Sequence, residues 1–382
     1  MRVIVIGGLA RSLVNFRGPL LKALTERGHE VLACAPAADE SIQSQLAQWG
    51  VEYRHVPMAR ASMNPLGDLA TFRALFRLFR KEQPDVVLGY TIKPVIWGSL
   101  AARFARIPRR YAMITGLGYA FIDGGGRKQR VVQRVVSSLY RTALKGADAV
   151  FFQNPDDERE FRERGLIQRE TTSILTNGSG VDLDAFPSRP LPSEPVFLLL
   201  ARLIGDKGIR EYREAARSIR RHYPDAKFLL AGGKDPNPAA ISDEELRQWQ
   251  TEGDIEYLGD LDDVRPALAD CAVYVLPSYR EGTPRTVLEA MSMGRAIITT
   301  DAPGCRETVE EGVNGYLVPV RDAAALADAM ERFIDNPALV AEMGRQSRRL
   351  AEEKYDVHKV NATVIAGLGL DSGGVLSGYP DV

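Results

Sequence analysis

The chain has 382 residues, 45% of them hydrophobic and 26% charged, and a formal net charge of −1. A chain of this length is too long for one ordinary hydrophobic core, and it predicts two domains of roughly 150 to 200 residues. No run of about 18 apolar residues is present to cross a bilayer, and the apolar part of "MRVIVIGG" is too short for a signal peptide. We therefore expect a folded soluble protein whose first residues form a β-strand.

The three cysteines, Cys34, Cys271 and Cys305, exclude two further classes of protein. They are odd in number, far apart and without CxxC spacing. Neither a disulfide framework nor a zinc site is expected from such a set.

The two halves of the chain differ in charge. Residues 1–186 contain 26 basic and 18 acidic residues, whereas the remainder contains 23 and 32. Most of the excess lies in residues 51–150, with 17 basic and 6 acidic residues. The first half is therefore expected to meet something anionic, either a membrane surface or a phosphorylated ligand.

In chain order, the first half alternates short β-branched runs with longer helical patterns. The runs are "RVIVIG" (2–7), "HEVLACA" (29–35), "DVVLGY" (85–90), "YAMIT" (111–115) and "ADAVFFQN" (147–154). This alternation predicts a parallel sheet with helices on both faces.

The same pattern starts again after a segment rich in Pro, Gly and Ser at 177–195, which is typical of a linker. Its runs are "VFLLLAR" (196–202), "KFLLAGG" (227–233), "IEYLG" (255–259), "AVYVLPS" (272–278), "RAIITT" (295–300) and "GYLVPV" (315–320). We expect an α/β protein with two doubly wound domains, at 1–186 and 187–355, and a C-terminal helix and tail at 356–382 that crosses back to the first domain. Open α/β sheets bind ligands at the carboxyl ends of their strands, so function is sought in the loops that follow them.

One such loop, "EGTPRTVLEAMSMG" (281–294), places two acids in front of and within an apolar helical run. Thr283 is a candidate N-cap and Pro284 suits the first helical position, so unpaired N–H groups of this helix would favour an anion such as a diphosphate. Glu289 lies about 8 Å beyond the start at 1.5 Å per residue, where a carboxylate needs partners. Ribose hydroxyls would provide them, and local backbone donors are the alternative.

A second loop, "ARLIGDKGIREY" (201–212), places Arg202 and Lys207 directly after a strand. Two cations beside a helix N-terminus suit a diphosphate, although a solvated turn is the simpler explanation.

The combination of Glu281, seven residues and Glu289 with the Arg202/Lys207 loop closely resembles the retaining GT-B glycosyltransferases of group 1, or family 4 type. The resemblance extends over "FLLAGG", "IEYLGDLDDV", "GRAIITTDAPGCRETVEEGVNGYLV" and the N-terminal half. It implies a GT-B fold, in which two Rossmann-like domains face each other across a cleft.

The resemblance also implies roles for individual residues. Glu281 would contact the donor sugar, Glu289 the ribose, and Arg202 and Lys207 the diphosphate. Donor binding would further involve the backbone at Gly282, Thr283 and Pro284. Gly304, Cys305 and Glu307 lie where the family has another loop of the cleft.

In the first domain, Gly7 and Gly8 follow the first strand and would let the backbone approach the donor closely. The segment lacks G-x-G-x-x-G, and no acid ends the second strand, which counts against a dehydrogenase. The loops that follow the strands of this domain supply candidate residues for acceptor binding. They look like the acceptor-side loops of bacterial enzymes that extend polyprenyl-diphosphate-linked sugars, and ordinary structural loops are the alternative. These candidates are Arg11, Asn15, Tyr90, Thr91, Lys93, Thr115 and Tyr119.

The helical segment 127–144, "RKQRVVQRVVSSLYRTAL", is basic and amphipathic. Its apolar stripe consists of Val131, Val132, Val135, Val136 and Leu139, and its basic residues are Arg127, Lys128, Arg130, Arg134 and Arg141. Such a helix suits interfacial membrane docking, and a stripe that belongs to the domain core is the alternative.

Many relatives carry a histidine where this chain has "TGLGY", which puts a His-assisted step in doubt. The absence fits a same-face displacement in which the departing diphosphate accepts the acceptor's proton, with electrostatic stabilisation by Arg202 and Lys207. No metal or cofactor is expected. The two D-x-D triplets, at Asp182 and at Asp260, are interpreted as turns or caps.

The sequence thus predicts a cytoplasmic glycosyltransferase, peripheral to the inner face of the membrane. It would move a hexose or N-acetylhexosamine from a UDP-sugar to a polyprenyl-diphosphate-linked saccharide, for surface polysaccharide or glycan assembly. No nucleic-acid partner is expected. The rival interpretations are a nucleotide-sugar epimerase and a non-catalytic partner subunit that binds nucleotide sugar or lipid.

Overall fold

The computed structural model describes residues 1–59, 64–117, 127–235, 237 and 239–371. The chain forms two compact units. Unit 1 comprises Met1–Thr176 with the residues from His358 onward, and unit 2 comprises Asn177–Val357.

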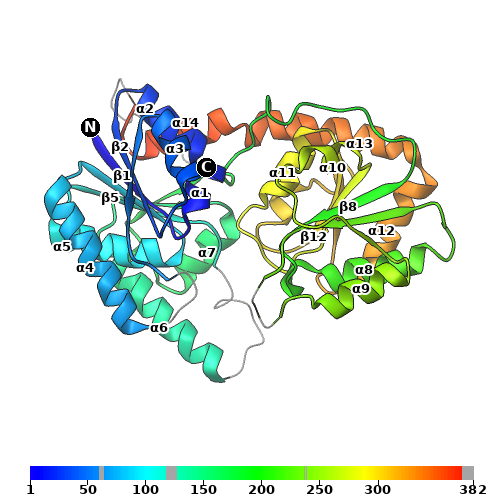
Figure 1. Ribbon diagram of the computed structural model, residues 1–382, viewed down its shortest axis with the longest axis horizontal. Helices are drawn as coiled ribbons and strands as arrows, with labels where there is room; N and C mark the ends of the chain where they lie inside the picture. The colour runs from blue at the N-terminus through cyan, green and yellow to red at the C-terminus, as the bar shows by residue number, and fades with distance from the viewer. Residues whose placement is uncertain (60–63, 118–126, 236, 238, 372–382) are drawn as a thin grey trace. The chain divides into compact units, whose positions relative to one another are not determined.

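Unit 1 is built on a seven-stranded parallel sheet with helices on both faces (Figure 1). The strand order is β3-β2-β1-β4-β5-β6-β7. The strands are β1 (Arg2–Ile6), β2 (Glu30–Ala35), β3 (Val51–His55), β4 (Val86–Tyr90), β5 (Arg109–Ile114), β6 (Ala149–Phe152) and β7 (Thr172–Leu175). The two edge strands, β3 and β7, are additions to the five strands expected from the sequence.

Two groups of helices bury the faces of this sheet. One face is covered by α1 (Ala10–Asn15), α2 (Gly18–Glu26), α3 (Glu40–Gln48) and α14 (Val357–Gly367). The other is covered by α4 (Pro65–Glu82), the π-helical turn η1 (Pro94–Gly98), α5 (Ser99–Ala105), α6 (Arg127–Leu144) and α7 (Pro155–Glu163).

Unit 2 repeats the architecture with a six-stranded parallel sheet in the order β10-β9-β8-β11-β12-β13. Its strands are β8 (Val196–Leu200), β9 (Lys227–Ala231), β10 (Glu256–Tyr257), β11 (Val273–Leu276), β12 (Ala296–Thr300) and β13 (Gly315–Val318). One face packs on α8 (Ile209–Ile219), α9 (Asp243–Thr251) and α12 (Ala323–Asp335), and the other on α10 (Arg265–Ala269) and α11 (Arg285–Ser292). The helix α13 (Pro337–Leu350) and the π-helical turn η5 (Ala351–Tyr355) follow.

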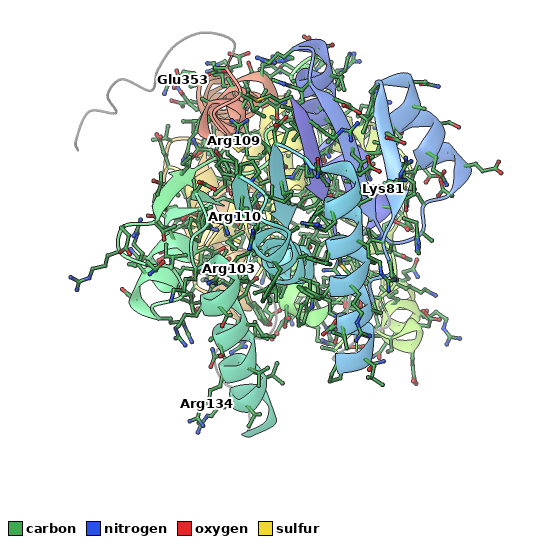
Figure 2. All side chains as sticks on the ribbon, turned by 90° about the vertical axis from the view of Figure 1, so that its left-hand side faces the viewer. Lys81, Arg103, Arg109, Arg110, Arg134 and Glu353 are labelled. Atoms are coloured by element: carbon green, nitrogen blue, oxygen red, sulfur yellow. The ribbon has the colours of Figure 1, made fainter. Side chains whose placement is uncertain are left out.

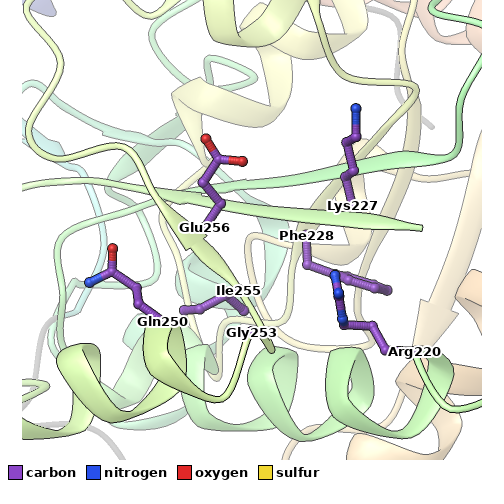
Figure 3. A pocket seen from close by; sticks show the side chains of 7 residues that line it. All are labelled: Arg220, Lys227, Phe228, Gln250, Gly253, Ile255 and Glu256. Carbon is purple, nitrogen blue, oxygen red and sulfur yellow. The ribbon is translucent and has the colours of Figure 1, made fainter. Parts of the chain in front are cut away.

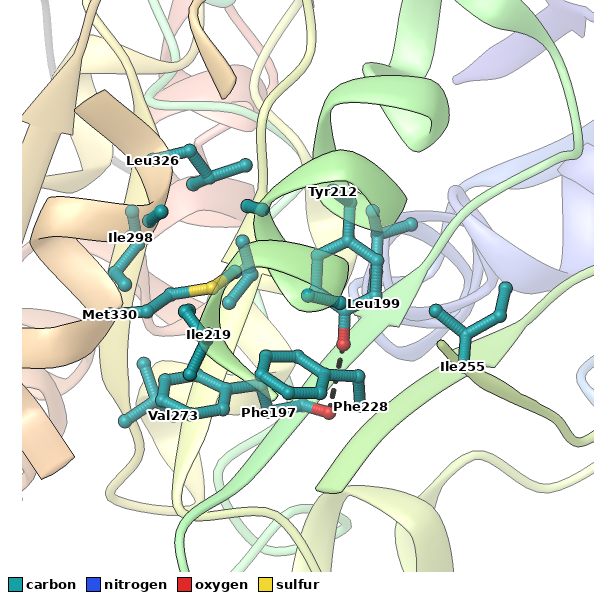
Figure 4. Packing of buried hydrophobic residues seen from close by; sticks show 14 of the residues in the cluster. Phe197, Leu199, Tyr212, Ile219, Phe228, Ile255, Val273, Ile298, Leu326 and Met330 are labelled. Atoms are coloured by element: carbon teal, nitrogen blue, oxygen red, sulfur yellow. Dashed lines mark hydrogen bonds between the residues drawn. The ribbon is translucent and has the colours of Figure 1, made fainter. Parts of the chain in front are cut away.

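Aromatic stacking and one buried hydroxyl organise the core of unit 2 (Figure 4). The rings of Phe197 on β8 and Phe228 on β9 stack with centroids 5.3 Å apart. The Tyr212 hydroxyl of α8 donates to the carbonyls of Phe197 and Leu229, both at 3.0 Å. Because a buried hydroxyl needs a partner, these bonds fix α8 against the sheet.

The fold class predicted from the sequence is confirmed, since both sheets are parallel and doubly wound. The division between the units falls after Thr176, ten residues before the boundary placed at 186. Part of the predicted linker packs on unit 2, where the buried Arg295 guanidinium donates to the carbonyls of Arg189 and Pro190 at 3.1 Å. The last helix lies in unit 1, where the Tyr111 hydroxyl donates to the Leu368 carbonyl at 3.1 Å.

Each sheet has one point at which the strand order reverses direction. In unit 1 it lies between β1 and β4, and in unit 2 between β8 and β11. Loops that leave the carboxyl ends of such neighbouring strands run to opposite faces and leave a crevice between them, where ligands of this fold class bind.

Candidate active site

An ion pair occupies the reversal point of unit 2. Lys207 ends the 3-10 turn η3 (Gly205–Lys207) after β8, Glu281 follows β11, and the Lys207 ammonium contacts Oε1 of Glu281. The buried Ser278 hydroxyl donates to the same oxygen at 2.7 Å. The two charged side chains are only 18% and 14% exposed, so the interaction is partly shielded from water.

Backbone contacts fix the two loops against each other. The Tyr279 N–H donates to the Asp206 carbonyl at 2.9 Å. Gly208 has φ +70°, and a Cβ there would lie 2.1 Å from the Pro277 carbonyl oxygen. Only glycine fits this position, so the backbones of the two loops pack directly against each other here.

The loop after β12 supports Glu281 from its other side. The Glu281 N–H donates to the Pro303 carbonyl at 2.9 Å, and the Cys305 thiol lies 3.8 Å from the Ser278 carbonyl. Gly304, at φ +78°, packs against the Glu281 backbone. The structure thus brings Gly304 and Cys305 to the predicted site.

Glu307, in the same loop, connects it to the C-terminal part of unit 2. Its backbone carbonyl accepts hydrogen bonds from the Tyr355 hydroxyl and from the Lys354 ammonium, the latter at 3.2 Å. Burial raises the pKa of the Glu307 carboxyl. These bonds to the Glu307 backbone anchor the loop to η5.

The helices α8 and α11 both begin at this point, with Gly208 and Pro284 as N-caps. Neither N-cap residue makes a side-chain hydrogen bond to the first-turn N–H groups of its helix. The expected helix start was one residue early: Pro284 itself is the extended N-cap. Thr283 directs its hydroxyl to the Gly282 carbonyl at 3.0 Å.

Glu289 is buried in α11, with 6% of its surface exposed. Its Oε1 forms an ion pair with the Arg285 guanidinium, one turn earlier, with Nε at 2.8 Å. The sequence suggested ribose hydroxyls or backbone donors as its partners, and the structure supplies Arg285. Burial raises the pKa of Glu289, although Arg285 acts in the opposite direction.

A Glu289→Gln substitution is therefore expected to change the pH dependence of stability. A carboxyl whose pKa is raised in the folded state stabilises the fold below its unfolded pKa of about 4.3 and loses that contribution as pH rises through the folded value. The wild-type free energy of unfolding should fall over this window relative to that of the variant. Urea denaturation of both proteins between pH 4 and pH 8 measures the difference, and parallel curves would contradict the expectation.

Arg202 is placed at the start of the loop after β8, with its side chain 51% exposed. Its guanidinium pairs with Asp235 in the loop after β9 at 2.6 Å, and the other Asp235 oxygen accepts from the Asn237 N–H at 3.0 Å. The second predicted cation thus lies at the same carboxyl edge of the sheet, held by a carboxylate.

The reversal point of unit 1 is closely packed. A Cβ on Gly7 would lie 2.3 Å from the Tyr90 hydroxyl oxygen, and one on Gly8 would lie 2.8 Å from Oγ1 of Thr91. Tyr90 is 2% exposed, bonds the Ser12 hydroxyl at 2.7 Å, and burial raises its pKa to about 12. In this structure, then, Gly7 admits the tyrosine ring, and Tyr90 supports the loop from inside.

The remaining acceptor-side candidates differ in their surroundings. Arg11 and Asn15 are exposed on α1, and Thr115 is half-buried after β5. Lys93 pairs with Asp68 of α4 at 2.6 Å, with both side chains less than one-fifth exposed. Tyr119 lies outside the described residues.

Sequence reasoning missed three residues of the site. Ser278 was treated as the end of a strand, and its spacing of three residues from Glu281 was the available signal. The spacing of four between Arg285 and Glu289 on a helix is itself a signal for an ion pair. Asp235 gives no local signal, because its contact with Arg202 spans two strands.

The surroundings of the first D-x-D triplet, which begins at Asp182, explain its sequence. Asp182 accepts from the N–H groups of Asp184 and Ala185 at 3.0 and 2.9 Å, which is the turn that the sequence suggested. Within the described ranges, no three His, Cys, Asp or Glu side chains gather in a way that could hold a metal ion.

A pocket of about 300 Å³ in unit 2 lies away from this site (Figure 3). Among its lining residues, Lys227 and Glu256 begin β9 and β10, and Arg220 follows α8. It therefore lies at the amino ends of these strands, opposite the edge that carries Lys207 and Glu281. Lys227 is further occupied by an ion pair with Glu194.

The fold and the site define a class of protein: two Rossmann-like units, one with an acid and a lysine meeting at its reversal point. Residues 194–336 match the family of group 1 glycosyl transferases, and residues 15–178 match the glycosyl transferase 4-like domain. The chain belongs to this glycosyltransferase family, and the resemblance found in the sequence is confirmed.

Curated relatives match over most of the chain. It is 31% identical to N,N'-diacetylbacillosaminyl-diphospho-undecaprenol alpha-1,3-N-acetylgalactosaminyltransferase of Campylobacter jejuni, over 93% of this chain and 95% of that one. It is 26% identical to UDP-Gal:alpha-D-GlcNAc-diphosphoundecaprenol alpha-1,3-galactosyltransferase of Escherichia coli, over 74% and 75% of the two chains.

Solved structures match the whole architecture. Anabaena HepE in complex with UDP and glucose superposes with a TM-score of 0.75 at 19% identity, over 97% of this chain and 99% of the other. Sucrose-phosphate synthase of Thermosynechococcus elongatus gives a TM-score of 0.77 at 17% identity, over 95% and 97%. These likenesses confirm the GT-B fold class.

Proposed function

We propose that the protein transfers a sugar from a UDP-sugar to a hydroxyl of a polyprenyl-diphosphate-linked saccharide, with retention at the anomeric carbon. The observation that carries this proposal is the meeting of Lys207, Glu281 and two helix N-termini at the reversal point of unit 2. An ammonium and aligned N–H groups attract a diphosphate, and the adjacent carboxylate accepts hydrogen bonds from sugar hydroxyls.

In the proposed reaction, Lys207 and Arg202 stabilise the charge that develops on the departing UDP. The acceptor hydroxyl attacks the anomeric carbon from the face that the diphosphate leaves, and its proton passes to the leaving phosphate oxygen. UDP and the lengthened saccharide are the products, and no metal or cofactor takes part. Electrostatic stabilisation of this kind is commonly the largest single contribution to catalysis.

The acceptor class is taken from the relatives, whose names specify undecaprenol-diphosphate-linked sugars. The test is transfer with a panel of UDP-, GDP- and ADP-sugars onto polyprenyl-diphosphate mono- and disaccharides. Transfer from a UDP-hexose or UDP-N-acetylhexosamine with an α product supports the proposal. Conversion of a UDP-sugar without acceptor would favour the epimerase, and the absence of any turnover would favour a binding subunit.

Membrane contact at the inner face of the cell membrane is proposed for the exposed surface of α4, α5 and α6. The apolar stripe of α6 divides: Val136 and Leu139 pack against the core, whereas Val131 and Val135 are 58% and 46% exposed. Phe104, at the end of α5, is 65% exposed. Part of the stripe therefore belongs to the core, and the exposed part is the surface for which we propose membrane contact.

The charge of this surface suits anionic lipid. Figure 2 shows Arg103 and Arg134 on the face of unit 1 that carries α5 and α6. The only acids within these three helices, Asp68 and Glu82, pair with Lys93 and Arg2. The exposed basic residues are Arg73, Arg77, Arg80, Lys81, Arg103, Arg106, Arg130, Arg134, Arg141 and Lys145. In the described part of the chain, no helix has the length and apolar character needed to span a bilayer.

A Val131→Glu/Val135→Glu variant is expected to lose at least tenfold in binding to vesicles that contain phosphatidylglycerol, because it removes apolar contacts and repels the surface. Co-sedimentation at 50 and 300 mM salt measures the effect, and wild-type binding should weaken with salt. Val320→Glu, at an exposed valine of unit 2, is the matched control. Equal binding by all three proteins would count against this surface.

A further inference from the structure

Tyr279 connects three loops at the carboxyl edge of unit 2. It follows Ser278, which bonds Glu281. Its backbone N–H holds the loop of Lys207 through Asp206, and its hydroxyl donates to Oε1 of Glu211 in the first turn of α8 at 2.6 Å. The side chain therefore joins the loop after β11 to the helix that follows Lys207.

A third contact comes from the loop after β13. The Arg321 guanidinium lies 4.7 Å from the centroid of the Tyr279 ring, a cation–π distance. Arg321 itself has φ +60°, a left-handed conformation that costs a non-glycine residue energy. The surrounding structure supports that conformation, and the stacked ring is one of its contacts.

The hydrogen bond to Glu211 matters because of where that carboxylate lies. The second oxygen, Oε2, is buried and has no hydrogen-bond partner among the described residues. The hydrogen bond from the Tyr279 hydroxyl therefore replaces an important part of the hydration that the Glu211 carboxylate loses on burial. Burial, followed by the hydrogen bond to Glu211, raises the pKa of Tyr279 to about 12, so the hydroxyl remains protonated and donating at neutral pH.

We infer that Tyr279, through Glu211 and Arg321, is a positioning residue that sets the distance between Lys207 and Glu281 for donor binding. It touches neither reacting group, and it acts by fixing the loops that carry them. This inference rests on the proposed function, because it assumes that a nucleoside diphosphate binds between these loops. It deepens that proposal by assigning residues to the control of donor affinity.

The test compares two ways of breaking the same hydrogen bond. Tyr279→Phe keeps the ring and removes the donor, and Glu211→Ala removes the acceptor. Each is expected to weaken UDP binding in calorimetry and to raise the donor KM about tenfold, the loss of one charge-assisted hydrogen bond, while the acceptor KM is unchanged. Glu211→Gln retains an acceptor oxygen and should bind UDP within about twofold to threefold of wild type.

Tyr223→Phe is the matched control, since the Tyr223 hydroxyl donates to the Asp335 carboxylate at 2.7 Å elsewhere in unit 2. It should leave UDP binding unchanged, and thermal unfolding shows that each variant is folded. UDP affinity and donor KM within twofold of wild type in folded Tyr279→Phe would overturn the inference and leave the proposed function standing. A wild-type protein that binds no nucleoside diphosphate would overturn both.

Discussion

Glu281→Ala is expected to lower kcat for sugar transfer by about a thousandfold while the protein remains folded. Loss of one electrostatic group aimed at the reacting centre costs about 10² to 10³ in rate, and this change also removes the partner that positions the Lys207 ammonium. Because a carboxylate repels a diphosphate, the variant should bind UDP at least as tightly as wild type. Steady-state kinetics with calorimetry of UDP binding separates the two effects.

Lys207→Met removes the charge of the other member of the ion pair. It should lower kcat by about 10² and weaken UDP binding as well, since the ammonium attracts the diphosphate both before and during the reaction. Glu194→Ala breaks an ion pair with Lys227, at the amino end of β9, and is the control for the loss of a salt bridge alone. Transfer by Glu281→Ala at a rate within tenfold of wild type would refute the assignment of Glu281.

In unit 1, the strands that the sequence predicted are those that lie inside the sheet. Strand β4 is buried along its whole length, and such continuous apolar runs are typical of parallel sheets. The unpredicted strands β3 and β7 are at the edges of the sheet, with largely half-exposed or exposed residues. Edge strands are covered less completely, so their sequences carry a weaker apolar pattern.

The loops of the site were identified because each follows a predicted strand, but the partners of their side chains were not. Lys207 and Glu281 are 74 residues apart and meet only because β8 and β11 are neighbours. Which strands are adjacent depends on the strand order of the sheet, and a single sequence does not determine that order. For the same reason the packing of the Tyr90 ring against Gly7 was not predicted.

Gly304→Ala tests whether the backbone around Glu281 is as constrained as the structure indicates. A Cβ at this position would lie 2.2 Å from the Glu281 carbonyl oxygen and 2.5 Å from that of Gly282. Both atoms belong to the backbone and cannot rotate away, so the loop that carries Glu281 must shift. A displacement of about 1 Å costs on the order of a hundredfold in rate, and we expect kcat/KM to fall by about that factor.

Gly312→Ala separates this displacement from the general cost of a left-handed alanine. Gly312 has φ +74°, close to the +78° of Gly304, but nothing lies within 4 Å of the added Cβ. Both variants should lose about 1 kcal/mol or more of unfolding free energy, because both force alanine into the same backbone region. Only Gly304→Ala should also lose activity, because only its Cβ clashes with the loop that carries Glu281. A Gly304→Ala protein with wild-type kcat/KM would show that the position of Glu281 tolerates movement, and that its carboxylate contributes to donor binding without fixed geometry.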